Sequence, residues 1–148
     1  MKKEMLSLNG WIAEAEEWQQ SLADFLIEYN MRELECSAED LLAKMQEMLD
    51  VMEKSVEYGL SGVKSHSGLT GGDAKRLAEA EADERFISLL GEKATDAVIY
   101  ATAVGECNAA MGRIVAAPTA GASGVLPGVF FSLKKHYQLS DVTMQRGM

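Results

Sequence analysis

Apolar residues recur at helical spacing in the first part of the chain. Between Ser7 and Leu34 they follow the i, i+3, i+4, i+7 pattern of an amphipathic helix, at Leu22, Phe25, Leu26 and Tyr29. Trp11 and Trp18 lie seven residues apart, so both fall on one stripe of such a helix. The pattern predicts one helix from Ser7 to Leu34.

A second helix is predicted after Ser37. This serine is followed by Glu39 and Asp40, and a hydroxyl before acidic residues is a typical N-cap. The apolar positions that follow form one face, at Leu41, Leu42, Met45, Met48, Leu49, Met52 and Val56. Gly59 suits the C-terminal cap. We expect a helical hairpin over residues 1–58, with its methionine-rich face in the core.

A third helix is predicted from Glu92 into the centre of the chain. Its buried side is expected at Ala94, Ala97, Val98, Ala101 and Val104. The segment before it, residues 79–92, is charged and expected to be exposed, with Phe86, Ile87, Leu89 and Leu90 as anchors. No segment shows the alternation of a strand, so the fold is predicted to be all-α.

The central stretch carries almost no charge. From Cys107 to Phe131 the only charged side chain is Arg113. Repeated glycines and prolines interrupt it too often for a membrane-spanning helix. We therefore expect a buried helix, a tight Pro-Thr-Ala-Gly turn and a second buried helix, which together form the most buried part of the protein.

The turn could bind an anion. Pro118 cannot continue a helix, and Thr119 is a natural N-cap for the next one. Ala120 and Gly121 leave the backbone N–H groups there uncovered, which suits a carboxylate or a phosphate. The polar groups able to lean over the turn are Asn108 and Arg113. The alternative is that the small residues only allow two helices to pack closely.

A glycine-rich loop precedes this region, and 11 of the 13 glycines fall between Gly59 and Gly128. Its candidate contributors to a site are Lys64, Ser65, His66, Ser67, Gly71, Gly72 and Asp73. Asp73 is predicted to be the N-cap of a helix that runs through Leu77. The loop either closes over a substrate or is a surface loop with a capped helix after it.

Length and charge narrow the class of protein. The 148 residues suffice for one domain with a sizeable core, predicted here as a single domain over 1–148. A net charge of −9 argues against nucleic acid and anionic membranes as partners. Residues 1–58 hold 5 Lys/Arg and 14 Asp/Glu, whereas residues 59–148 hold 9 of each. The site is therefore expected in the second part.

Cysteine content bears on compartment and metal binding. Cys36 and Cys107 are far apart and form neither a disulfide framework nor a CxxC metal site, so no metal ligands are predicted in this chain. The start, Met1-Lys2-Lys3-Glu4, does not lead into an apolar segment of the secretory type. A cytoplasmic location is the simplest expectation.

Several ordered motifs resemble one enzyme family. They are Glu106, Asn108-Ala109-Ala110, Gly112-Arg113, Ala117-Pro118-Thr119-Ala120-Gly121, Gly124-Val125-Leu126-Pro127 and the earlier Gly71-Gly72-Asp73-Ala74-Lys75. Together they are similar to the alpha chain of iron–sulfur-dependent L-serine dehydratases, and the likeness covers nearly the whole chain. The resemblance implies conversion of L-serine to pyruvate and ammonia. The Thr119–Gly121 turn would hold the substrate, supported by Asn108 and Arg113.

The resemblance also implies a cofactor and partners. Enzymes of this family use a [4Fe–4S] cluster as a Lewis acid on the serine hydroxyl. Such a cluster needs three or four thiolates, and this chain has two cysteines. We expect the ligands to lie beyond Met148, in the rest of an alpha chain of which this is an N-terminal part, inactive alone. A dehydratase beta chain or domain, a homo-oligomer, or both, would be its partners. No lysine motif of a pyridoxal-phosphate enzyme is found.

A second class of function stays open at this point. A non-catalytic all-α interaction or dimerisation domain would also explain the methionine-lined hairpin in residues 1–58.

Overall fold

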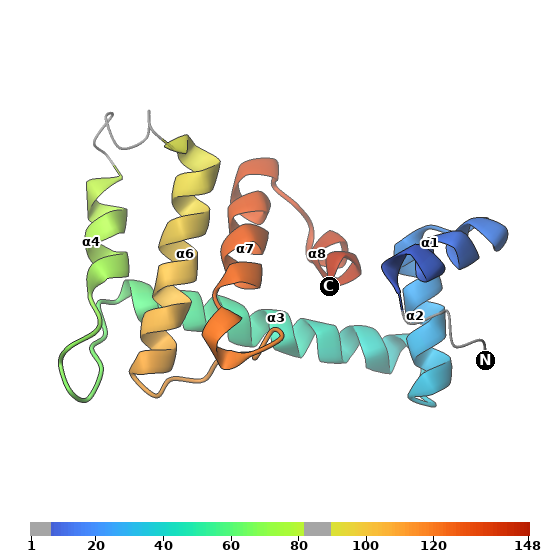
Figure 1. The fold of residues 1–148 in the computed structure, drawn as a ribbon, viewed down its shortest axis with the longest axis horizontal. Coiled ribbons are helices and arrows are strands. Elements are labelled where there is room, and N and C mark those ends of the chain that lie inside the picture. The colour runs from blue at the N-terminus through green and yellow to red at the C-terminus, as the bar shows by residue number, and fades with distance from the viewer. Residues whose placement is uncertain (1–6, 82–89) are drawn as a thin grey trace. The chain divides into compact units, whose positions relative to one another are not determined.

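The computed structural model describes residues 7–81 and 90–148, and the fold is all-α, as predicted (Figure 1). The elements are α1 (Leu8–Glu17), α2 (Leu22–Glu33), α3 (Ala38–Leu60), α4 (Asp73–Ala80), α6 (Glu92–Ala109), the 3₁₀ turn η1 (Ala120–Ala122), α7 (Val125–Tyr137) and α8 (Asp141–Gly147). Within the described residues, strand-like pairing is limited to one isolated bridge between Lys64 and Gly71. No helix in those parts of the chain is long and apolar enough to cross a membrane. The expected anchors Phe86, Ile87 and Leu89 fall outside the described residues.

The chain divides into two compact units. The first comprises Met1–Gln46 with Gln145–Met148, and the second comprises Glu47–Met144. All of the residues that the sequence offers as site candidates belong to the second unit.

The first unit corrects the prediction of one helix from Ser7 to Leu34. The helix breaks into α1 and α2 because Gln19 adopts a left-handed φ of 55° and Ser21 starts a new helix. The Ser21 hydroxyl oxygen accepts a hydrogen bond of 3.2 Å from the backbone N–H of Asp24. Ser21 and Asp24 are the sequence signal of this second start, and the apolar periodicity hid it.

The start of α3 agrees with the prediction. The Ser37 hydroxyl oxygen accepts from the backbone N–H of Asp40 at 3.1 Å, and the Asp40 carboxylate accepts from the backbone N–H of Ser37 at 3.3 Å. These reciprocal bonds form a capping box. Met52 is buried, in keeping with a core role for the methionine face.

Three helices of the second unit, α4, α6 and α7, lie side by side in that order (Figure 1). Gly59 is not a C-cap as predicted but lies within α3, and a Cβ on it would collide with the Ala103 carbonyl of α6. This glycine therefore lets the backbones of α3 and α6 approach closely.

The burial of the central stretch differs from the prediction. Cys107, Pro127 and Phe131 are buried, but Ala116 and residues 118–121 are exposed, so Cys107–Phe131 is not the most buried stretch. Small side chains carry too little apolar area to draw this connection into the core.

The expected buried side of α6 is also partly wrong. Val104 is buried, whereas Ala94 and Val98 are exposed. The helix instead buries two carboxylates, Asp96 and Glu106, both of which have hydrogen-bond partners.

Candidate functional site

A buried carboxylate joins the end of α6 to the start of α4. Glu106 is 3% exposed and accepts three backbone hydrogen bonds from residues more than 30 positions earlier. Its Oε2 is 3.0 Å from the N atom of Gly72, and its Oε1 is 2.6 Å from that of Asp73 and 3.3 Å from that of Ala74. These N–H groups have no partner within α4, so Glu106 caps this helix from another element.

This contact corrects the role predicted for Asp73. The N-cap position belongs to Gly72, which has a left-handed φ of 87° and, as a glycine, no side chain with which to cap the helix. The Asp73 carboxylate instead pairs with Arg76 on the exposed surface of α4. The cap was missed from sequence because Glu106 is distant along the chain, and local capping rules consider only neighbouring residues.

The loop before α4 is folded back on itself. The Ser65 backbone N–H donates to the Thr70 carbonyl at 2.8 Å, and the Gly68 N–H donates to the Ser65 carbonyl at 2.9 Å. Gly71 adopts a φ of 123°, and a Cβ there would collide with the Val63 carbonyl. Gly71 and the hydrogen bonds to Glu106 therefore fix the C-terminal end of the loop.

The loop residues that are predicted to contribute to the site differ in their exposure to solvent. Lys64, His66 and Ser67 are exposed, whereas Ser65 is half-buried. The Ser65 and Ser67 hydroxyl groups lie 3.2 Å apart, so one donates to the other. The structure therefore brings the hydroxyl groups together and leaves the ammonium and imidazole groups to solvent.

The Ala117–Gly121 turn is exposed and connects α6 to α7. Thr119 is an N-cap, as predicted: its Oγ1 accepts from the backbone N–H of Ala122 at 3.2 Å. The element that it caps is the 3₁₀ turn η1, however, and α7 begins only at Val125. Pro127 thus falls in the first turn of α7, where a helical N–H has no partner in any case.

The glycines near this turn serve two purposes. A Cβ on Gly124 would collide with the Ala101 carbonyl, and one on Gly128 would lie 2.6 Å from the Ala97 carbonyl oxygen. These two positions are required for close packing of α7 on α6. A Cβ on Gly121 would meet only the Thr119 Oγ1, at 3.9 Å. Packing within the described residues therefore does not explain Gly121.

Arg113 and Asn108, the residues predicted to support the turn, have other neighbours within the described residues. Arg113 lines a pocket of about 190 Å³ with Val51, Lys54, Tyr58 and Cys107. Asn108 is half-buried near the C-terminal end of α6, and its carbonyl accepts from Met111 at 3.0 Å. Among the described residues, neither side chain forms a hydrogen bond to Thr119.

A second cluster of charges went unnoticed at the sequence level. Asp96 is 1% exposed, and its carboxylate lies 2.9 Å from the Nζ of Lys135 and 2.6 Å from the Nε2 of His136. Burial alone would raise the pKa of Asp96, but the hydrogen bonds from these two residues outweigh it and lower the pKa. The cluster ties α6 to α7. The sequence signal for this cluster is the acidic Asp96 near the start of α6 together with the basic Lys135 and His136, which follow it by 39 and 40 positions.

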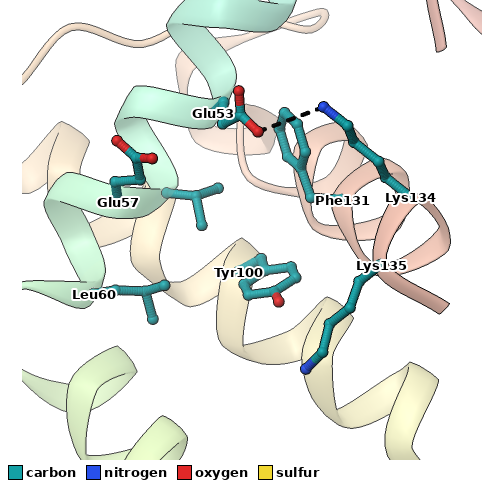
Figure 2. A pocket seen from close by; sticks show the side chains of 8 residues that line it. Glu53, Glu57, Leu60, Tyr100, Phe131, Lys134 and Lys135 are labelled. Atoms are coloured by element: carbon teal, nitrogen blue, oxygen red, sulfur yellow. Dashed lines mark ion pairs between the residues drawn. The ribbon is translucent and has the colours of Figure 1, made fainter. Parts of the chain in front are cut away.

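Beside this cluster lies a pocket of about 300 Å³ (Figure 2). It is lined by Glu53, Val56, Glu57 and Leu60 of α3, Tyr100 of α6, and Phe131, Lys134 and Lys135 of α7. Lys134 is already paired with Glu53 at 3.5 Å and with Asp141 at 3.0 Å. Lys135 is held by Asp96. Both lysines that line this pocket are therefore paired with carboxylates, and the Glu53–Lys134 pair lies within the pocket itself.

The donor atoms of this chain do not fit an iron–sulfur cluster. Cys36 and Cys107 belong to different compact units, and a cluster takes several thiolates. Burial raises the pKa of the Cys107 thiol, and its Sγ is engaged with the Arg113 carbonyl at 3.7 Å. Within the described residues, no group of three or more His, Cys, Asp or Glu is placed to hold a metal ion.

Comparisons with known proteins agree with the resemblance. A family model described as "Serine dehydratase alpha chain" matches residues 3–148. A protein of Bacillus subtilis (strain 168) named "Probable L-serine dehydratase, alpha chain" is 45% identical over 114 residues, which are 77% of this chain and 37% of the relative. The "L-serine dehydratase, alpha chain" of Peptoniphilus asaccharolyticus is 32% identical over 126 residues, 84% of this chain and 42% of the relative. No solved structure gives a significant match. The matched region therefore spans well under half the length of these relatives.

Proposed function

The chain belongs to the serine dehydratase alpha-chain family, and from this premise we propose that it forms part of an L-serine dehydratase. In that enzyme L-serine is converted to pyruvate and ammonia. The part of the site that this chain supplies is the exposed turn Thr119–Gly121. It binds the substrate carboxylate.

The observation that carries this assignment is the open space over Gly121. A glycine at this position is needed neither for packing nor for a left-handed φ, in contrast to Gly124, Gly128 and Gly72. The turn lies at the surface, where a ligand can reach it. A residue without a side chain at such a position allows a ligand to approach the backbone N–H groups.

The hydrogen-bonding capacity of the turn suits a carboxylate. A hydroxyl group has one donor and two acceptor positions. The Thr119 oxygen accepts from Ala122, which leaves its O–H free to donate to a substrate oxygen. The backbone N–H groups of Ala120 and Gly121 precede the first bond of η1 and are further donors. Hydrogen bonds to an ionised carboxylate are about twice as strong as those between neutral groups.

The loop from Lys64 to Gly72 is the second element of the proposed site. Glu106 fixes its C-terminal end, and the same turn of α6 leads into the connection that carries Thr119. The exposed Lys64, His66 and Ser67 are the loop side chains able to contact a bound substrate. Asn108 and Arg113 are proposed to support the turn once the enzyme is complete.

The cofactor is proposed to be ligated outside this chain. The two cysteines do not form a ligand set for a [4Fe–4S] cluster. The isolated chain is accordingly proposed to be inactive. A beta chain or domain, a second copy of the enzyme, or both, are proposed as further partners.

An assay of pyruvate formation tests the proposal. This chain is joined to the part of the Bacillus subtilis alpha chain outside the matched region, and the beta chain is supplied. We expect L-serine-dependent pyruvate release from the complete enzyme and none from the isolated chain. A complete enzyme that carries an intact cluster but does not turn over L-serine would contradict the proposal.

A further inference from the structure

Helix α6 begins with two exposed charged residues, Glu92 and Lys93, and beyond them it exposes an uncharged side and buries its charged residues. Between Ala94 and Ala109 its charged residues are Asp96 and Glu106, and both are buried. The exposed positions in that range are Ala94, Val98 and Gly105. A solvent-facing helix normally shows the opposite distribution, with charges outward.

Helix α7 also exposes an uncharged side. From Val125 to Leu133 it carries no charge, and the residues spaced four apart along one side are exposed. Val125 is 63% exposed, Val129 45% and Leu133 36%. Residues four apart on a helix are neighbours, so these three form a continuous apolar stripe.

The two stripes lie on the same side of the helix pair. Helix α7 runs antiparallel to α6, since Gly124 is against Ala101 whereas Gly128 is against Ala97. In an antiparallel pair of helices, the residues that come directly after the contact residues of either helix project toward the same side of the pair. Val98 follows Ala97, and Val125 and Val129 follow the two glycines. The opposite side, with Tyr100 and Phe131, faces the pocket shared with α3 (Figure 2).

Gly105 provides an independent observation. A Cβ on Gly105 would meet no atom within 4 Å, and its φ is not left-handed. Glycine inside a helix costs roughly 1 kcal/mol relative to alanine. Neither packing nor backbone conformation within the described chain compensates that cost. A surface glycine is accounted for if another backbone approaches it from outside.

We propose that this surface, the α6–α7 face (Ala94, Val98, Gly105, Val125, Val129 and Leu133), is the docking site for the remaining part of a serine dehydratase alpha chain. The matched region covers 37% and 42% of two curated relatives, so most of each of those chains lies outside it. Small and β-branched side chains without charge suit close packing of helices or loops. The inference rests on family membership and on these exposures, and not on turnover of serine.

The lack of charge on the α6–α7 face favours a protein segment as its binding partner. A charged partner such as nucleic acid would need basic residues, and the stripes have none. Lys93 lies at the far end, where its Nζ donates to the Tyr137 hydroxyl at 2.7 Å and forms a polar edge. An uncharged centre with a polar edge is the usual composition of a protein–protein interface. The Thr119–Gly121 turn connects the same two helices, so the docked part would come close to the proposed substrate turn.

The test is a binding measurement between two polypeptides. The 148-residue chain is co-expressed with the unmatched part of the Bacillus subtilis alpha chain, and complex formation is measured by size-exclusion chromatography with light scattering and by titration calorimetry. The variant Val129→Glu introduces a charge into the α6–α7 face, and Gly105→Phe introduces a bulky side chain. The matched control is Val142→Glu in α8, because Val142 is 63% exposed, as Val125 is, but lies outside the face. Circular dichroism verifies that each variant keeps its helices.

We expect a 1:1 complex with the unaltered chain and with the Val142 variant. Val129→Glu should weaken it about a hundredfold or more, because the new charge would be buried without a partner. Gly105→Phe should weaken it by about tenfold or more through steric blocking. Absence of a complex with the unaltered chain, or equal binding by all variants, would overturn the proposal. A homodimer of the chain that dissociates with Val129→Glu would also overturn it, since a second copy would then be the occupant.

Discussion

The Oε1 atom of Glu106 lies 2.6 Å from the backbone N of Asp73, across 33 positions of sequence. This bond is one of three through which a buried carboxylate caps a helix that it does not belong to. Two segments that resemble the family separately, the glycine loop and the end of α6, are therefore one structural unit.

Replacing Glu106 should release the loop. Glu106→Ala removes the acceptor of three N–H groups, and we expect a loss of roughly 3 kcal/mol in the free energy of unfolding. Glu106→Gln keeps one acceptor oxygen and should lose less. Urea denaturation measures the loss, and hydrogen exchange at Gly72, Asp73 and Ala74 locates it. Unchanged protection of these amides in Glu106→Ala would show that the bonds do not hold the loop.

The Asp96 cluster predicts a defined dependence of stability on pH. The folded pKa of Asp96 is below its ordinary value of 3.8, so its contribution is full above that value and is lost as pH falls through the lowered pKa. At pH 7, Asp96→Asn should cost roughly 2 kcal/mol, with allowance for the half-exposed Lys135. The difference between the two proteins should shrink below pH 3.8.

Unfolding by urea at pH 7, 4 and 2.5 measures this difference. The exposed Glu47 of the same unit provides the control, because Glu47→Gln removes a surface carboxylate that does not line the pocket beside the cluster. A constant difference between Asp96→Asn and the unaltered chain at all three pH values would contradict the assigned role.

Substitutions of Gly124 and Gly121 should differ in their effect on the free energy of unfolding. Gly124→Ala places a Cβ against the Ala101 carbonyl and should destabilise the chain by about 1–3 kcal/mol. Gly121→Ala adds the same group in open space and should leave the free energy of unfolding within about 0.5 kcal/mol. Thermal unfolding of both variants provides the comparison. Equal destabilisation would mean that Gly121 also serves packing.

The two thiols should differ in reactivity. Cys107 is 1% exposed and burial raises the pKa of its thiol, whereas Cys36 is half-buried. Since the thiolate is the reactive form, a disulfide reagent should label Cys36 first in the native chain. Cys36→Ser should leave a protein that reacts fully only in denaturant. Rapid native labelling of that variant would be inconsistent with the buried position of Cys107.

Local signals predict the helices well. The break between α1 and α2 also has a local signal, in Ser21 and Asp24, which the apolar periodicity hides, whereas contacts between distant residues account for the errors at Glu106 and Gly59. The Ser37 cap was predicted because its partner, Asp40, is three residues away. The cap that Glu106 provides was not predicted, because Glu106 and the helix that it caps are 33 positions apart in sequence. Likewise the local sequence at Gly59 suggests a helix end, although this glycine lies within α3 and allows the backbone of Ala103 in α6 to approach.

The candidate site was predicted in part for the same reason. The local context of Thr119 predicts a cap, and its Oγ1 accepts from the N–H of Ala122, but the element that it caps is η1 and not the helix that follows. The positions of Asn108 and Arg113 depend on how the connection folds, which spacing alone does not determine. Val98 was expected to be buried because it is apolar, but it is 45% exposed in this chain. The proposed docking of the remaining alpha chain would account for that difference.

The Gly121→Val variant of the complete, cluster-loaded enzyme, assembled from this chain and the remaining part of the Bacillus subtilis relative, directly tests whether the Thr119–Gly121 turn binds L-serine. A β-branched side chain would cover the N–H groups proposed to bind the carboxylate, whereas Gly121→Ala is the smaller matched change. Thr119→Ala should cost about 0.5–1.5 kcal/mol of transition-state binding, through loss of one hydrogen bond. We predict that Gly121→Val lowers kcat/KM for L-serine at least tenfold, mainly through KM, with the cluster absorption and thermal stability unchanged. A Gly121→Val enzyme with the kcat/KM of the unaltered protein would contradict the assignment of this turn as the substrate site.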